Sequence, residues 1–227
     1  MHIHLHHMEM GEGYPLILLH GNGENCSYFY HQLHYFSRWY RVIAIDTRGH
    51  GMTPRGTAPF TIRQFAQDLL AFMDAMELPR AHILGFSDGA NIAMCFALAH
   101  PERVSRLILN GGNLYPAGVR FADQREITRQ YREAAAAAEH DPGAVADAEM
   151  LGLMVNDPNI MPWHLRKLTM PTLVIAGTHD VIRTGHTRLI ARCIPHARLV
   201  LLPGDHFIAA NRPEEFNRAV HAFLADS

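Results

Sequence analysis

A chain of 227 residues, 48% hydrophobic and 19% charged, is long enough to form one globular domain with a full core. A net charge of −2 offers no positive field for nucleic acid or an anionic membrane surface. No run approaches the roughly 20 apolar residues of a membrane span, and the amino terminus lacks a secretory signal pattern. We therefore expect a cytoplasmic protein, a monomer or homodimer, with a small-molecule partner and no nucleic-acid or membrane partner.

Strands and helices are predicted to alternate along the chain. Apolar, β-branched runs predict strands at residues 3–9, 16–20, 41–45, 82–84, 107–110, 173–176 and 199–202. Helical periodicity predicts helices at residues 28–36, 62–76, 89–100, 186–194 and 213–225. Such alternation indicates an α/β fold, a mostly parallel central sheet with helices on both faces, in a single domain spanning residues 1–227.

The alternation lapses between residues 113 and 168, which predicts a small helical insertion. Three helices are expected there, at residues 121–140, 143–155 and 161–167. Large apolar side chains in this segment are candidates for lining a pocket, although each could equally pack the insertion onto the core. They are Tyr115, Phe121, Met150, Met154, Trp163 and Leu165.

The segment Gly85-Phe86-Ser87-Asp88-Gly89 lies between an apolar run and a helical stretch. It predicts a strand, a tight turn and a helix with Ser87 at the apex, the nucleophile elbow of a serine hydrolase. Gly85 and Gly89 suit this interpretation, because strand and helix approach so closely that only small residues fit on either side of the serine. The alternative is an ordinary glycine-rich turn.

A serine needs a base to take its proton and an acid to orient that base. Asp180 follows the predicted strand ending near Gly177, and His206 lies in the loop after the last predicted strand. Residues beyond the carboxyl ends of parallel strands converge on one crevice, so Ser87, Asp180 and His206 are expected to meet there. Asp205 could compete with Asp180, yet an adjacent residue normally points away from its neighbour's ring.

The order Ser, Asp, His, each just after a strand, resembles that of the α/β-hydrolase family. The resemblance extends over nearly the whole chain, and the Ser-Asp-Gly elbow with Asn110 to Tyr115 is similar to the branch of valacyclovirase-type esterases. It implies an α/β-hydrolase fold whose insertion at 113–168 is a cap over the active site. Four further segments carry the resemblance: Leu16 to Gly23, Asp46 to Thr53, Pro171 to Gly177 and Pro203 to Pro213.

The resemblance also implies an oxyanion hole made by the backbone N–H groups of Asn22 and Asp88. Donors fixed at that place stabilise the negative charge of a tetrahedral intermediate, and the Asp88 amide opens a helix. The loop that contains Asn22 could instead be a plain turn. Asp88, Tyr115 and Trp163 are expected to bind substrate. The Asp88 carboxylate would attract a substrate ammonium group, unless it only complements the helix dipole.

These residues predict a serine hydrolase that cleaves a small carboxylic ester through an acyl-enzyme, without a cofactor. The same triad also serves thioesterases, amide or peptide hydrolases and carbon–carbon bond hydrolases, and the fold serves slow-turnover ligand receptors. The 17 histidines include His2, His4 and His6, which alternate along the first predicted strand and share one face. No histidine pair has the spacing of a catalytic metal site, so no metal is expected.

Overall fold

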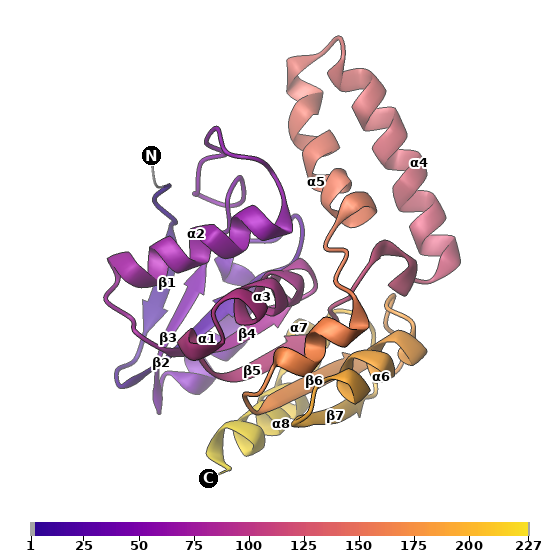
Figure 1. Ribbon diagram of the computed structural model, residues 1–227. Coiled ribbons are helices and arrows are strands. Elements are labelled where there is room, and N and C mark those ends of the chain that lie inside the picture. The colour runs from indigo at the N-terminus through magenta and orange to yellow at the C-terminus, as the bar shows by residue number, and fades with distance from the viewer. Residues whose placement is uncertain (1–2, 227) are drawn as a thin grey trace.

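The computed structural model describes residues 3–226 and contains a seven-stranded sheet between two layers of helices (Figure 1). The strand order is β1-β3-β2-β4-β5-β6-β7, with β1 antiparallel to β3 and every other neighbouring pair parallel. This confirms the predicted α/β-hydrolase fold. The strands are β1 His7–Met10, β2 Tyr14–Leu19, β3 Tyr40–Ile45, β4 Ala81–Phe86, β5 Val104–Asn110, β6 Thr172–Gly177 and β7 Ala197–Leu202.

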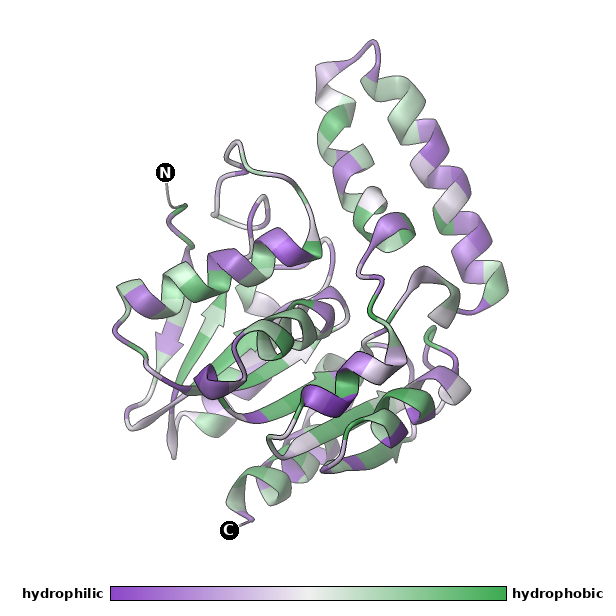
Figure 2. Ribbon diagram, in the orientation of Figure 1, coloured by the Kyte–Doolittle hydropathy of each residue, from purple (hydrophilic) through white to green (hydrophobic). Residues whose placement is uncertain are grey.

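Alternate side chains of the central strands supply two separate cores, because neighbouring residues of a strand point to opposite faces. Ile17 and Ile43 pack beneath α2 (Ile62–Ala75), α3 (Asp88–Ala99) and α6 (Thr184–Cys193). Leu16 and Val42 pack beneath α1 (Tyr30–Phe36) and α8 (Pro213–Ala225). Hydrophobic residues accordingly dominate the central strands in Figure 2. Among residues 3–226, no helix is long and apolar enough to cross a bilayer. A short helix, α7 (Ile208–Asn211), directly precedes α8.

The first strand is shorter than the predicted 3–9. β1 begins at His7, although the His6 carbonyl still accepts a hydrogen bond from the Asp46 N–H at 2.8 Å. The His6 N–H donates to Thr53 Oγ1 at 2.8 Å, and the His6 ring turns onto the Asp46 carboxylate. Partners in the loop after β3 therefore hold this segment in place of a regular strand ladder, and the His6 ring is half-buried against Asp46.

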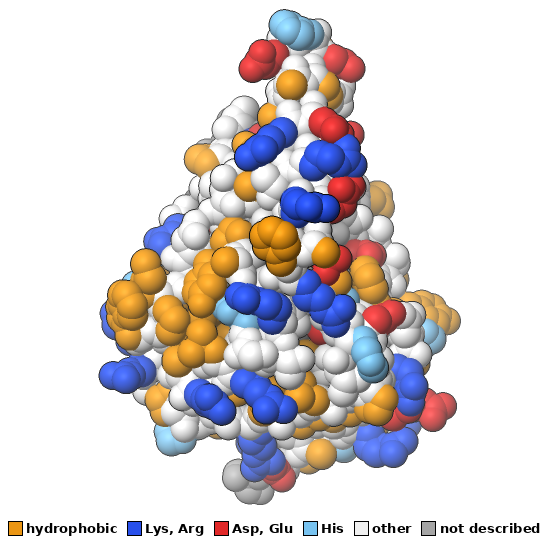
Figure 3. Space-filling view, turned by 90° about the vertical axis from the view of Figure 1, so that its right-hand side faces the viewer, with side chains coloured by type: hydrophobic (Ala, Val, Ile, Leu, Met, Phe, Trp, Pro, Cys, Tyr) orange, Lys and Arg blue, Asp and Glu red, His pale blue; other side chains and the backbone are white. Residues whose placement is uncertain are grey.

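The insertion between β5 and β6 is a helical hairpin that projects from the body of the molecule (Figure 1). It consists of α4 (Phe121–Ala138) and α5 (Val145–Asn156), followed by a 3-10 turn at Pro162–Lys167 in place of the third predicted helix. No side chain of α4 is buried, and Leu153 is the buried side chain of α5. In Figure 3 acidic and basic side chains are interspersed over the projecting hairpin.

The hairpin leaves and re-enters the core at one point. Its stem is closed by a hydrogen bond of 2.6 Å from the Ile160 N–H to the Leu114 carbonyl. A second contact joins α5 to the loop that contains Arg55. Arg55 forms a bidentate ion pair with Glu149 of α5, with nitrogen–oxygen distances of 2.6 and 2.5 Å. These polar contacts hold the hairpin against the core, since it buries so little apolar surface of its own.

Candidate active site

Ser87 occupies a sharp turn between the end of β4 at Phe86 and the start of α3 at Asp88. Its φ of 54° and ψ of −118° are strained for a residue with a side chain, at a cost on the order of 1–3 kcal/mol. A Cβ on Gly85 would lie 2.2 Å from the Gly89 carbonyl oxygen, and one on Gly89 would lie 2.0 Å from the Leu19 carbonyl oxygen. Glycine is therefore required at both places, and the predicted elbow geometry is present.

His206 joins Ser87 to Asp180 in one chain of hydrogen bonds. Its Nε2 lies 3.0 Å from Ser87 Oγ, and its Nδ1 lies 2.7 Å from Asp180 Oδ1. With Nδ1–H donating to the carboxylate, the Nε2 lone pair faces the serine hydroxyl, the arrangement that proton abstraction needs. The Ile182 N–H donates to the same Asp180 oxygen at 2.8 Å, which fixes the buried carboxylate.

Asp205, the competing acid, points away from the imidazole of His206. Its carboxylate instead accepts hydrogen bonds from the Phe207 N–H at 2.9 Å and from Asn211 Nδ2 at 3.0 Å. These contacts join Asp205 to both ends of α7, a short helix that the sequence pattern did not predict. Asp180 is thus the carboxylate that contacts the ring.

Gly111 is a residue of the site that sequence reasoning did not single out. It follows β5 with a φ of 62°, and its amide donates to the Ile175 carbonyl at 3.1 Å. A Cβ there would lie 2.9 Å from His206 Cε1 and 3.3 Å from Asp180 Oδ2. Two adjacent glycines directly after a predicted strand were the available signal, because a close approach of backbone to another group often requires glycine.

The loop after β2 lies against the elbow, where the oxyanion hole was expected. A Cβ on Gly21 would lie 3.1 Å from Ser87 Cβ. His20 holds this loop: its Nδ1 donates to the Gly21 carbonyl at 2.7 Å, and its Nε2 accepts the Thr47 N–H at 3.0 Å. Burial lowers the pKa of His20 to about 4, so the ring is neutral and keeps both bonds. The amide of Asn22 follows directly in this loop.

The Asp88 carboxylate is held by two amide side chains. Asn22 Nδ2 donates to Oδ2 at 2.9 Å, and Asn91 Nδ2 donates to Oδ1 at 3.1 Å. Burial raises the pKa of Asp88, against the effect of these two hydrogen bonds. The sequence interpretation expected an unpaired carboxylate facing the crevice, whereas both of its oxygens have partners. Asn22 also donates to the Met150 carbonyl of α5 at 2.9 Å, so one side chain connects the elbow to the hairpin.

The residues expected to line a pocket differ in their burial and in their neighbours. Tyr115 packs against His186, with ring centroids 4.7 Å apart, and Leu165 is fully buried in the core. Phe121 and Trp163 are 81% and 61% exposed. The aromatic rings that contact His206 are instead Phe86 and Phe207, which the sequence did not indicate as site residues. Substrate binding by Tyr115 and Trp163 stays a prediction.

Side chains suited to a metal ion meet at one place among residues 3–226. They are His6, Cys26 and Asp46, whose candidate ligand atoms all lie within 4.8 Å of one another. None of the three contacts Ser87, Asp180 or His206 through a hydrogen bond.

A mostly parallel sheet with a strained serine after its central strand, a histidine and a carboxylate defines a hydrolase-type site on an α/β scaffold. A family model described as "alpha/beta hydrolase fold" matches residues 14–146, more than half of the chain. The chain belongs to the α/β-hydrolase family.

Several relatives cover almost the whole chain. It is 27% identical over 236 residues to 3-oxoadipate enol-lactonase 2 of Acinetobacter baylyi, covering 92% of this chain and 88% of that protein. It is 28% identical over 255 residues to 2-hydroxymuconate semialdehyde hydrolase of Pseudomonas putida, covering 96% and 90%. The crystal structure of an enol-lactonase from Burkholderia xenovorans LB400 superposes with a TM-score of 0.81 at 25% identity, covering 98% and 96%. The comparisons support hydrolase activity.

Proposed function

We propose that this protein is a serine hydrolase that cleaves a small carboxylic ester through an acyl-enzyme, with Ser87 as nucleophile, His206 as base and Asp180 as orienting acid. The observation that carries the proposal is the His206 ring, whose two nitrogens lie 3.0 Å from Ser87 Oγ and 2.7 Å from Asp180 Oδ1. The strained backbone of Ser87 adds support, because strain of this kind concentrates at functional sites.

In the acylation step Ser87 Oγ attacks the ester carbonyl while its proton passes to His206 Nε2. The oxyanion accepts hydrogen bonds from the backbone N–H groups of Asn22 and Asp88, the second of which opens α3 and has no acceptor within the helix. Asp180 stabilises the imidazolium. His206 then returns the proton to the departing alkoxide, and an alcohol leaves.

In the deacylation step a water molecule attacks the acyl-enzyme carbonyl, and its proton passes to the neutral His206. The same two amides hold the second oxyanion, and collapse of the intermediate returns the proton to Ser87 Oγ. The product is a carboxylic acid, and no cofactor takes part in either step.

The helical hairpin serves as the cap in this proposal. Asn22 Nδ2 donates to both Asp88 Oδ2 and the Met150 carbonyl, so the position of α5 is coupled to the residue after the nucleophile. One relative is named for an enol-lactone, which is a cyclic ester, and this favours lactones among the esters to be tested.

Carbon–carbon bond hydrolysis is a second candidate, favoured by the similarity to 2-hydroxymuconate semialdehyde hydrolase. The same Ser87 and oxyanion donors would act on a ketone carbonyl, and a carbanion would replace the alkoxide as leaving group. Parallel assays would distinguish the candidates by kcat/KM. The substrates are p-nitrophenyl acetate and a five-membered lactone for ester cleavage, a thioester, and an unsaturated 1,5-diketone for carbon–carbon bond cleavage.

The decisive test is Ser87→Ala with a fluorophosphonate probe and p-nitrophenyl acetate. Wild type should be labelled and turn over, and Ser87→Ala should lose labelling and at least about a thousandfold in kcat, because the hydroxyl supplies the covalent step. His206→Ala should match it. Equal turnover in Ser87→Ala and wild type would refute the assignment, whereas ligand binding by wild type without labelling or turnover would indicate a receptor.

Selection of an ammonium group by Asp88 is a separate proposal about the substrate. The two hydrogen-bond donors to the Asp88 carboxylate are uncharged amides, which favour the ionised form of the carboxylate without neutralising it, and an ionised carboxylate there would attract a cation that approaches the elbow. An α-amino-acid ester should then be cleaved faster than its des-amino analogue by wild type, and Asp88→Asn should remove the preference. Equal rates in wild type would eliminate it.

A further inference from the structure

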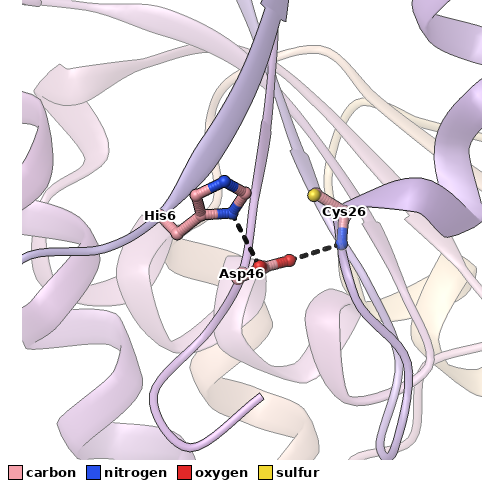
Figure 4. A group of neighbouring side chains, drawn as sticks. All are labelled: His6, Cys26 and Asp46. Atoms are coloured by element: carbon pink, nitrogen blue, oxygen red, sulfur yellow. Dashed lines mark hydrogen bonds and ion pairs between the residues drawn. The ribbon is translucent and has the colours of Figure 1, made fainter. Parts of the chain in front are cut away.

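A second site of defined chemistry lies beside the end of β3, where His6, Cys26 and Asp46 converge (Figure 4). The residues come from three separate segments: the stretch before β1, the 3-10 turn Cys26–Phe29 and the loop after β3. Each offers one strong metal-ligand atom: an imidazole Nδ1, a thiol Sγ and a carboxylate oxygen. The proposed hydrolysis uses none of them.

We infer that His6, Cys26 and Asp46 form a binding site for a single Zn²⁺ ion, with solvent as the fourth ligand. A thiolate, an imidazole and a carboxylate together form a ligand set typical of zinc. In tetrahedral coordination at bond lengths of about 2.0–2.3 Å, ligand atoms lie roughly 3.3–3.8 Å apart. The three atoms here already lie within 4.8 Å of one another, and His6 Nδ1 lies 2.8 Å from Asp46 Oδ2. Small side-chain movements suffice to admit the ion.

The backbone around the site is fixed independently of any ion. His6 is held on both sides, since its N–H donates to Thr53 Oγ1 and its carbonyl accepts the Asp46 N–H, both at 2.8 Å. The Asp46 carboxylate is oriented by the Cys26 N–H at 2.6 Å and the Met52 N–H at 2.8 Å. Backbone donors of this kind set the direction of a ligating carboxylate. The ion would take the place of the hydrogen bond between His6 Nδ1 and Asp46 Oδ2, with the imidazole hydrogen on Nε2, and of the proton on the Cys26 thiol.

Burial and access also suit a bound cation. Asp46 and Cys26 are buried, whereas the His6 side chain is 34% exposed, so an ion can enter from the His6 side. In Figure 4 the Cys26 sulfur lies on the side that faces the His6 ring. Coordination forms a zinc–sulfur bond and releases the thiol proton to solvent. The ion would cross-link three chain segments near the loop that contains Asn22, four residues before Cys26.

The test uses Co²⁺ as a spectroscopic substitute for Zn²⁺ on the full-length protein. One equivalent should bind and give the intense near-ultraviolet absorption of a cobalt–thiolate bond, and Zn²⁺ should displace it. Cys26→Ser should lose that absorption. His6→Gln should weaken Co²⁺ binding at least about tenfold, since loss of even a hydrogen-bond partner of a metal ligand costs about 10–100-fold in metal affinity. Cys95→Ser and His4→Gln are matched controls, a second cysteine and an exposed histidine of the same amino-terminal segment, and should bind as wild type does.

Two further measurements test the zinc site even if one variant folds poorly. Zinc-edge X-ray absorption of the wild type should show one sulfur among nitrogen and oxygen ligands, and Zn²⁺ should raise the thermal midpoint of wild type more than that of His6→Gln. Absence of a thiolate band in wild type would overturn the proposal. So would its persistence in Cys26→Ser, or binding that His4→Gln abolishes and His6→Gln does not.

Discussion

Replacement of Gly111 by alanine tests whether the position of the His206 ring requires that residue 111 has no Cβ atom. Gly111 has a φ of 62°, where an alanine costs about 1–2 kcal/mol. Its Cβ would lie 2.9 Å from His206 Cε1 and 3.0 Å from Nδ1, whereas carbon atoms in ordinary contact are about 3.5 Å apart. The ring must therefore shift by about half an ångström, away from the line that joins Asp180 to Ser87.

A shift of that size should lower the rate of catalysis, because misplacement of a reacting group by about 1 Å can lower the rate a hundredfold. We expect Gly111→Ala to lower kcat/KM for p-nitrophenyl acetate about 10- to 100-fold and to lower the thermal midpoint by about 2–8 °C. Gly13→Ala is the control. Its φ is 98°, and the nearest atom to its Cβ would be the Trp39 carbonyl oxygen at 3.6 Å, so it should lose stability and keep its activity. A kcat/KM for Gly111→Ala within about twofold of wild type would refute the reasoning.

Three further predictions concern the acid, the buried histidine and the hairpin. Asp180→Asn should lower kcat by orders of magnitude while Asp205→Asn leaves it unchanged, and the reverse result would show that the wrong acid had been chosen. Burial lowers the pKa of His20 from 6.5 to about 4. As the pH falls, the unfolded chain therefore takes up a proton at His20 at a higher pH than the folded protein does. Stability should fall as pH decreases from 6.5 to 4, by up to about 3 kcal/mol, and urea unfolding of His20→Gln should lack that part of the slope. Arg55→Gln should speed amide hydrogen exchange in the helix that carries Glu149, as should 1 M salt in wild type; unchanged exchange in both would show that the ion pair does not hold the hairpin.

The fold could be predicted from sequence because its signals are local. Each strand is a short apolar run, and alternation with helices is sufficient to specify a parallel sheet. Ser87, Asp180 and His206 could be proposed for the same reason, since each follows a strand and the carboxyl ends of parallel strands share one edge. The structure brings the three side chains into hydrogen-bond contact.

Features that depend on contacts between distant segments could not be predicted. Asn22 Nδ2 donates to the Asp88 carboxylate, 66 residues away in sequence, and to the Met150 carbonyl, 128 residues away. No periodicity reports such pairs. Helical periodicity in the insertion predicted three helices, of which two are α-helices and the third is a 3-10 turn. It carried no information on whether the helices lie flat on the core or project from it. The exposure of Phe121 follows from that arrangement.

The closed stem of the hairpin has a consequence for the design of new specificities. Leu114 and Ile160 are joined by a backbone hydrogen bond of 2.6 Å, so the segment 115–159 begins and ends at almost the same point in space. α4 contributes no buried side chain, and the buried hydrophobic side chains of the segment are Val119 and Leu153, so an exchanged segment would have to reproduce few core contacts. The stem is therefore a natural junction for chimeras, in which caps from other family members are exchanged on one unchanged catalytic body.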